Sequence, residues 1–499
     1  MSFFKGKSSL SSSSNGDGQL CDDIEKNIKM LEEHFCHTED LMKKELRFHN
    51  QKCVILYLDS LVKKELLQAS IIEPILEMKS GEMEKTVHAA EIKRTSTISE
   101  AGKQLLDGFC MILIENNPQA YMASVGGIEG RAIQEPNSER SIKSTHDGFV
   151  EDFSSNLHLL RKRIKNPQLK VRYFTLGNLS NTKVGMVFIE NLANKELINE
   201  VERRITSIEI DQLYSTGELE DLIEDNPFSP FPHILATERP DRAVSYLTEG
   251  KITIILDGNP RVLVVPITFF AFYQTPDDYN SRWLVGSFFR IIRVFSFIIA
   301  ISLPAIYIAI VSFHSEVLPI GILYSIRVSL EYVPFPPLAE AIAMQIILEL
   351  LKEASIRLPS PIAQTIGIVG GLVIGTAVVD AHIVSNMMIV VIGFTAIASF
   401  VAPINEMGTS ARLLGFPTMI AASLFGFFGI VFVLMLIFMH LSKLDSFGTP
   451  YFSPIAPFKK EDLKDSLIRL PLWKLNTRPT DAKPAYAKQQ GQTRAWKKK

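Results

Sequence analysis

The chain has 499 residues, 46% of them hydrophobic and 21% charged, with a formal net charge of −2 at pH 7. This length exceeds what one hydrophobic core ordinarily organises, which excludes a small single-domain protein. Residues 1 to about 280 carry mixed charges, whereas residues 285–441 contain long apolar runs. We therefore expect a multi-domain protein in which a soluble part precedes a membrane part, with no nucleic-acid partner.

Residues 1–50 are predicted to be a flexible, charged leader. The opening MSFFKGKSSLSSSSNGDG has no apolar stretch of the kind that secretory signals carry, so we expect the N-terminal half to stay in the cytoplasm. The four cysteines follow no disulfide or zinc-binding spacing, which predicts free thiols.

A first cytoplasmic α/β domain is predicted over residues 51–132. KCVILYLDSLV and FCMILIEN are typical of buried strands, and the residues between them have a helical pattern. The following residues 133–146 are rich in turn formers and charges, and we interpret them as a linker.

A second cytoplasmic α/β domain is predicted over residues 147–280. Its pattern predicts, in chain order, a helix over 149–165, strands at LKVRYFTLG and KVGMVFIEN, a helix over 195–207 and a hairpin near 251–265. In the hairpin, Asp257 and Gly258 are predicted to form a two-residue turn.

The α-helical transmembrane domain is predicted over residues 281–441. About 20 apolar residues are needed to cross the hydrocarbon core, and four runs are long enough or nearly so: 287–312, 361–379, 382–402 and 413–440. Arg282, Arg290 and Arg293 precede the first run and Lys443 follows the last, so the positive-inside rule puts both termini in the cytoplasm.

Residues 317–357 leave the number of crossings open. Their first part holds Arg327, Glu331 and several prolines, and their second part is an amphipathic helix with one acidic face. This stretch is either re-entrant or interfacial, which leaves four spans, or it crosses twice, which makes six.

The run at 361–379 contains a stripe of small residues every four positions, a pattern that lets membrane helices approach closely. The stripe has two interpretations: it packs helices of one subunit together, or it lets identical helices from several subunits surround an axis. In the second case bulky neighbours would narrow a pore that gates by dewetting. The stripe residues are Ala363, Gly367, Gly371 and Gly375, and the narrowing residues are Ile368, Leu372 and Val373.

Glu349 and Glu353 are the candidate pore-mouth charges. Repeated around an axis, their carboxylates would form rings that attract cations. The alternative is a solvated helix face on which Lys352 and Arg357 neutralise them. The chain has no P-loop, dinucleotide fingerprint, HExxH or nucleophile elbow, so we expect no enzyme, no catalytic or metal-binding residues and no cofactor.

Residues 442–499 are predicted to be a basic cytoplasmic tail. They hold 13 Lys or Arg against 5 Asp or Glu, a net charge of +8.

Several phrases of the chain resemble the A subunit of the spore germinant receptors (GerA type) of endospore-forming bacteria. The resemblance runs in one order from about Asp147 to Phe458. The phrases are FPHILATERPDRAVSYLTEG, ILDGNPRVLVVP, DDYNSRW, EYVPFPPLAEAIAMQIILELLKEASIRLP, TIGIVGGLVIG and LDSFGTPYFSPIAPF.

This resemblance implies a multi-pass protein of the inner spore membrane that works with a permease-like B subunit and a lipoprotein C subunit. It implies that nutrient binding opens an oligomeric ligand-gated channel, which releases monovalent cations and starts germination. A transporter and a non-conducting scaffold subunit are the alternatives, although the unequal spans lack the repeated halves of many transporters. The germinant, the ion, the stoichiometry and the gate residue do not follow from the sequence.

Overall fold

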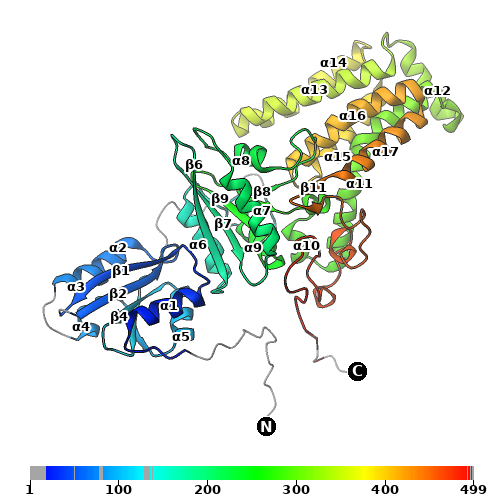
Figure 1. Ribbon diagram of the computed structural model, residues 1–499. Helices are drawn as coiled ribbons and strands as arrows, with labels where there is room; N and C mark the ends of the chain where they lie inside the picture. Colours follow the sequence, from blue (N-terminus) through cyan, green and yellow to red (C-terminus); the bar gives the residue numbers. More distant parts are fainter. Residues whose placement is uncertain are drawn as a thin grey trace.

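The computed structural model describes residues 18–49, 51–77, 82–127, 135–136, 139–491, 493–494 and 496. Over these residues the chain forms two sheet domains in succession and then a helical domain, as Figure 1 shows. The C-terminal segment (residues 444–491) returns to the junction between the second sheet domain and the helices. The prediction of two α/β domains followed by a helical region is confirmed.

The first sheet domain is built on five antiparallel strands in the order β1–β2–β4–β5–β3. Its strands are β1 (Leu41–Phe48), β2 (Gln51–Leu58), β3 (Ile92–Thr95), β4 (Phe109–Ile114) and β5 (Ala120–Ser124). Its helices are α1 (Ile24–His34), α2 (Lys64–Leu67), the π-helical turn Gln68–Ile72, α3 (Glu73–Glu77), α4 (Met83–Thr86) and α5 (Ile98–Leu106).

Helices cover both faces of this sheet. Successive side chains of a strand point to opposite faces, and in the central strands both sets are apolar. In β2, Val54 and Leu56 join the apolar cluster beneath α1 and α5, whereas Cys53 and Ile55 join the cluster beneath α2–α4. The prediction of a flexible leader is therefore wrong for residues 18–49, since α1 and β1 belong to this domain. Residues 1–17 lie outside the described part of the chain.

The second sheet domain has five antiparallel strands in the order β6–β7–β9–β10–β8. Its strands are β6 (Leu169–Leu176), β7 (Thr182–Ile189), β8 (Leu235–Thr237), β9 (Ile252–Leu256) and β10 (Val262–Val265). Its helices are α6 (Phe153–Arg163), α7 (Lys195–Thr206), α8 (Thr216–Ile223) and α9 (Pro240–Glu249).

The two sheet domains share one topology. In each, a helix precedes two strands, further helices and a strand follow, and a helix leads into the last two strands. The faces correspond as well: α6 and α9 cover one side of the second sheet and α7 and α8 the other.

The hairpin near 251–265 is present, but its predicted two-residue turn is wrong. Val262 of β10 faces Ile255 of β9, so residues 257–261 connect the strands. Only Gly258 of the predicted turn pair has a positive φ, of 79°, where glycine lacks the steric penalty of other residues.

The described part of the predicted linker packs against the second sheet domain. Glu139 forms an ion pair with Arg242 (Oε2 to Nη1, 2.9 Å), and Ser141 donates to a carboxylate oxygen of Asp277 at 2.5 Å. These residues thus extend the second domain towards its N-terminal side.

The helical domain is organised around α11 (Trp283–Ser312), which packs most extensively against α16 and α15. The remaining helices are α10 (Pro276–Asn280), α12 (Ile320–Glu331), α13 (Pro337–Arg357), α14 (Ser360–Asp380), α15 (Asn386–Phe400), α16 (Asn405–Phe425) and α17 (Phe427–Lys443). A 3₁₀ turn, Phe269–Tyr273, leads from β10 towards α10.

The run 413–440, predicted as one span, is divided between α16 and α17, so that prediction is wrong. Gly426 lies between the two helices with a φ of 60°, and α17 packs back against α16. The approach is close, since a Cβ on Gly429 would collide with the backbone of Ala421. Hydropathy alone does not register this turn, because apolar residues flank it on both sides.

The predicted tail is basic, but much of it is folded. It contains the short strands β11 (Asp445–Ser446) and β12 (Thr449–Pro450), the helix α18 (Leu463–Ser466) and a 3₁₀ turn (Leu472–Lys474). Tyr451 is fully buried, and the backbone N–H of Phe269 donates to its carbonyl at 2.8 Å. The C-terminal segment is therefore an integral part of the junction.

Candidate functional site

The candidate site is the helical domain together with its junction to the second sheet domain. Figure 1 shows α13 and α14 as a pair set beside the bundle of α11, α15, α16 and α17. Among the described residues, α13 is the helix against which α14 packs most. The part of α14 that the structure describes therefore has few neighbours besides α13.

The glycine stripe on α14 faces open space in the single chain. A Cβ built on Gly367, Gly371 or Gly375 would meet no described heavy atom within 4 Å beyond its chain neighbours and the backbone of its own helix. Ile368 and Leu372 are 63% and 66% exposed. Ala363 and Val373 belong to the same predicted set, but their side chains lie outside the described residues. At these three glycines, no other helix of the described part of the chain packs against the stripe.

The two predicted pore-mouth carboxylates have different partners. Glu353 forms an exposed ion pair with Arg357 at 2.6 Å, as the solvated-face interpretation expects. Glu349 instead reaches Arg412 on α16, with an Oε2 to Nε distance of 2.8 Å, and Lys352 lies 3.9 Å away. The structure therefore separates the two acids, one to solvent and one to a neighbouring helix.

Arg412 is a functional candidate that the sequence reasoning missed. Its side chain is only 3% exposed, and it also donates to Ser399 Oγ at 3.1 Å and to Thr409 Oγ1 at 3.0 Å. A single arginine inside the apolar stretch of α16 is a signal in itself, because charged residues at membrane depth are costly and are usually paired.

Glu340 is a second missed residue. It is 1% exposed on α13, and its Oε2 accepts the backbone N–H of Ser385 at 2.8 Å. Ser385 caps α15 and lies 3.3 Å from the hydroxyl of Tyr307 on α11. Glu340 Oε1 has no hydrogen-bond partner among the described residues. These groups form a buried polar link between α11, α13 and α15.

A buried charge network joins the start of α11 to the C-terminal segment. Arg290 is fully buried, and it donates to Asp278 at 3.2 Å and to Asp465 at 2.9 Å. Arg293 also pairs with Asp278, at 2.8 Å, and the Tyr279 hydroxyl donates to Asp465 at 2.7 Å. Displacing either segment from α11 would expose or orphan buried charges, which is strongly unfavourable.

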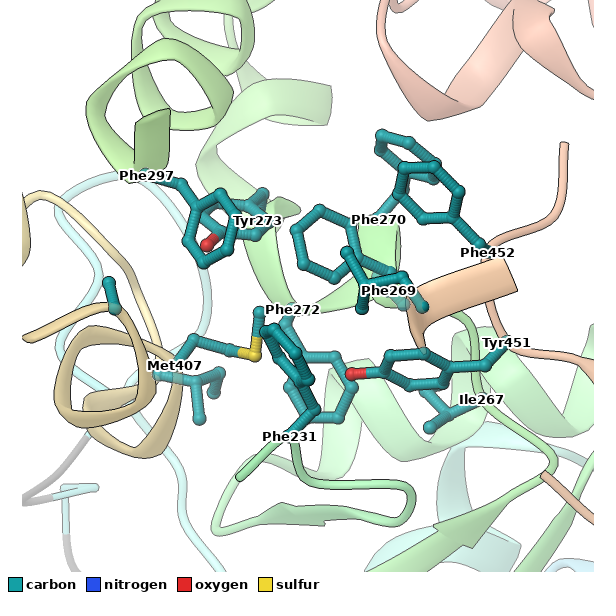
Figure 2. Packing of buried hydrophobic residues seen from close by; sticks show 14 of the residues in the cluster. Phe231, Ile267, Phe269, Phe270, Phe272, Tyr273, Phe297, Met407, Tyr451 and Phe452 are labelled. Carbon is teal, nitrogen blue, oxygen red and sulfur yellow. The ribbon is translucent and has the colours of Figure 1, made fainter. Parts of the chain in front are cut away.

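An aromatic cluster completes the junction, as Figure 2 shows. The ring centroid of Phe269 lies 5.3 Å from that of Phe297 on α11 and 5.5 Å from that of Phe452 in the C-terminal segment. Phe231 of the second sheet domain lies 6.2 Å from Phe269, and Met407 of α16 packs into the same cluster. One continuous core therefore spans the sheet domain, the helices α11, α15, α16 and α17, and the C-terminal segment.

Two titratable groups of the second sheet domain lie close to this junction. His233 is 1% exposed, and its burial lowers its pKa to about 4. Burial, followed by the charges of Glu406, Glu224 and Asp221, raises the pKa of Glu220 on α8 to about 8. Among the residues that the structure describes, no three His, Cys, Asp or Glu side chains are grouped as metal ligands.

Comparison with known proteins gives a consistent result along most of the chain. Residues 29–481 match the family described as Bacillus/Clostridium GerA spore germination protein. The chain is 36% identical to spore germination protein KA of Bacillus subtilis (strain 168) over 467 residues, which cover 91% of this chain and 86% of that protein.

Two further relatives have similar coverage. Identity is 39% to spore germination protein A1 of Bacillus subtilis (strain 168), over 78% of this chain and 81% of that protein. It is 35% to spore germination protein GerQA of Bacillus cereus, over 93% of each chain. Among solved structures, the N-terminal domain of the A subunit of the Bacillus megaterium spore germinant receptor GerK3 aligns with a TM-score of 0.41 at 23% identity, covering 51% of this chain and 98% of that one.

Proposed function

Because this chain belongs to the Bacillus/Clostridium GerA family of spore germination proteins, we propose that it is the membrane subunit of a nutrient germinant receptor. In this proposal the receptor also contains a permease-like subunit and a lipoprotein subunit, and it lies in the inner membrane of the spore. A nutrient bound by the complex changes the packing of the helical domain, and this change starts germination.

The apolar surface of the helical domain supports a membrane location. α11 is long and apolar enough to cross a bilayer, and α15 and α17 are shorter apolar helices. Large side chains on the outside of the bundle are exposed, among them Phe288, Phe295, Phe428 and Val431. Soluble monomers rarely expose so much contiguous apolar surface, whereas lipid accommodates it.

The distribution of charge and the fold support an orientation in the membrane. Both sheet domains and the C-terminal segment lie at the same end of the helices (Figure 1). The basic residues that flank α11 and α17 belong to this end, so it faces the cytoplasm by the positive-inside rule. α12 and α13 are separate helices, and the division of 413–440 between α16 and α17 removes the counts of four or six spans, which took this run as one crossing.

We further propose that several copies assemble around an axis lined by α14 and form a cation channel. The observation that carries this proposal is the open glycine face of α14, which no other described helix of the chain contacts. Small residues allow close contact between helices of neighbouring copies. Ile368 and Leu372 would then face a narrow apolar passage that excludes water until the packing changes.

Reconstitution tests this function directly. The full chain is incorporated into K⁺-loaded vesicles, alone and together with its co-produced partner subunits, and K⁺ release is recorded while amino acids and sugars are added. A channel predicts nutrient-dependent release only with the partners present. A scaffold predicts no release from any vesicle that contains this chain, and a transporter predicts uptake of labelled nutrient by this chain alone.

A further inference from the structure

The exposed apolar side chains of the second sheet domain are confined to one end of it. Among the described residues 147–281, four large apolar side chains are more than a third exposed. We call this set the α8 rim: Leu179 at 77%, Tyr214 at 63%, Leu222 at 47% and Phe228 at 102% exposed. Isolated exposed apolar residues need no explanation, but a set gathered at one end indicates a contact surface.

Hydrogen bonds hold the turn that carries Leu179 beside the segment that leads to Tyr214. The backbone N–H of Leu179, in the β6–β7 turn, donates to the carbonyl of Asp211 at 2.8 Å. The Thr182 hydroxyl donates to the carbonyl of Leu213 at 2.7 Å, which fixes the segment that leads to Tyr214. Tyr214 and Leu222 flank the outward face of α8, whose opposite face buries Leu219 and Ile223.

The loop after α8 is attached to the helical domain near the helix ends. The Ser229 hydroxyl lies 3.1 Å from Nε2 of His440, in the last turn of α17. The Ser410 hydroxyl, in the second turn of α16, donates to the carbonyl of Pro230. Phe228 therefore lies at the level where α16 begins and α17 ends. In the orientation proposed above, this level is the cytoplasmic surface of the membrane.

The charge of α8 indicates whether the α8 rim contacts the lipid surface or a cytoplasmic segment of another protein. Residues 216–225 contain five Asp or Glu and no Lys or Arg. Asp225 is paired with Arg204, and burial raises the pKa of Glu220, so the surface charge of α8 comes mainly from the exposed Glu218 and Asp221. Cytoplasmic leaflets are negatively charged and repel such a surface. The cytoplasmic loops of multi-span membrane proteins, in contrast, carry an excess of Lys and Arg close to the membrane.

We propose that the α8 rim docks a Lys- and Arg-rich cytoplasmic segment of a separate integral membrane protein, with Tyr214 and Phe228 as its apolar anchors. Aromatic residues often carry much of the binding energy of an interface, and complementary charges around them select the partner. The docked segment would sit beside the Ser229–His440 and Ser410–Pro230 contacts. A shift of the partner would therefore be transmitted to α16 and α17. This inference rests on the membrane orientation in the proposed function, but it does not require a pore.

Photo-crosslinking in the assembled receptor tests the proposal. A benzophenone amino acid replaces Phe228 in the full chain, which is produced with its partner subunits and irradiated in the membrane. The same replacement at Leu76, which is 60% exposed on the first sheet domain, is the matched control. We expect crosslinks from position 228 to a Lys- and Arg-rich loop of a membrane partner, mapped by mass spectrometry, and none to that loop from position 76. Crosslinks to lipid, to a second copy of this chain or to nothing would overturn the proposal.

A pair of substitutions measures the energetic contribution of the surface. Phe228→Ser and Asp221→Lys together remove an anchor and reverse an exposed charge, and Leu76→Ser with Glu77→Lys is the control. We expect co-purification of the membrane partner to fall by about tenfold or more, as for the loss of an interface hot spot. Unchanged recovery of the partner contradicts the proposal. Helix content and flotation with vesicles confirm that the variant is folded and inserted.

The outcomes separate this inference from the proposed function. If the receptor releases K⁺ but position 228 does not crosslink to a basic loop, the docking surface is wrong and the channel stands. If the crosslink forms but no vesicle releases K⁺, the docking surface stands and the channel fails. If the chain does not float with vesicles, the orientation on which both depend is wrong.

Discussion

The guanidinium of Arg161 and the carboxylate of Asp40 form a fully buried, bidentate ion pair that joins the two sheet domains. Arg161, on α6, donates from Nε and from Nη2, each at 2.6 Å, and Thr38 and Ser60 also donate to the carboxylate. Burial alone would raise the pKa of Asp40, but the charge and hydrogen bonds of Arg161 outweigh it and hold the pKa below its usual value. Asp40 is thus held as an anion inside the interface.

Replacing Asp40 by alanine should loosen the two sheet domains from each other. The variant leaves the Arg161 charge buried without its partner, which costs about 3–5 kcal/mol in comparable pairs. We expect faster hydrogen–deuterium exchange in α6 and in the turn before β1. The double variant Asp40→Leu with Arg161→Met is the control, because it removes both charges and should stay close to the wild type. Equal exchange in the single variant and the wild type would show that the pair does not hold the interface.

Leucine at Gly429 and leucine at Gly371 should have opposite consequences. A side chain at Gly429 collides with Ala421 on α16, whereas one at Gly371 meets no atom of the same chain within 4 Å. We expect Gly429→Leu to lower the thermal stability of the detergent-solubilised chain. Gly371→Leu should leave this stability unchanged but weaken assembly and K⁺ release, since close helix approach needs small residues. Normal assembly and release by Gly371→Leu would contradict the proposed axis of α14 helices.

The sequence predicted β2 and β4 well, but it missed the edge strand β1 for a physical reason. β2 and β4 are apolar on both faces, so their runs are recognisable. β1 reads LMKKELRF, with four charged residues, because it is the edge strand of its sheet and most of its side chains are exposed. Charged residues, especially lysine, are common on edge strands because they discourage further pairing. The charged composition of β1 therefore led to the prediction that residues 1–50 form a charged leader.

The candidate site was only partly predictable, because its main contacts join distant residues. The glycine stripe of α14 is periodic and visible in the sequence, as are Glu349 and Glu353. The partner of Glu349 is Arg412, 63 residues away, and Glu340 contacts Ser385 across 45 residues. No local pattern encodes such pairings, since they arise from the packing of α13 against α15 and α16. A polar residue inside an apolar run is the signal that would have selected Arg412.

Acidification should destabilise the junction through His233. Burial lowers its pKa to about 4, whereas an unfolded chain has a histidine pKa of about 6.5. The unfolded state therefore binds more protons in this window, and stability falls as the pH drops from about 6.5 to about 4. His233→Phe should reduce this slope in thermal unfolding measured at several pH values, and replacement of the exposed His88 by phenylalanine is the control. An unchanged slope in His233→Phe would exclude His233 as the cause.

Glu220 should have the opposite pH dependence. Its pKa is raised to about 8, first by burial and then by Glu406, Glu224 and Asp221. The native state then binds the extra proton, so this residue lowers stability as the pH rises from about 4 to about 8. We expect Glu220→Gln to unfold at a higher temperature than the wild type at pH 8 and at the same temperature near pH 4. Glu209→Gln, at an exposed position of the second sheet domain, is the matched comparison, and an equal gain in both variants would contradict a specific role for Glu220.

Neutralising Glu349 and Glu353 separately distinguishes a structural role from a pore role. Glu349→Gln removes the partner of the buried Arg412, which we expect to cost about 1.5–3 kcal/mol because a charged hydrogen bond is lost. Glu353→Gln breaks only an exposed pair within one helix, with an expected cost of about 0.3–0.5 kcal/mol. If the carboxylates of Glu349 and Glu353 from several copies form rings around a pore, both variants should lower the preference for cations over anions in reconstituted vesicles. If Glu349→Gln reduces only stability and Glu353→Gln changes neither property, the carboxylates serve the helical domain and do not line an ion path.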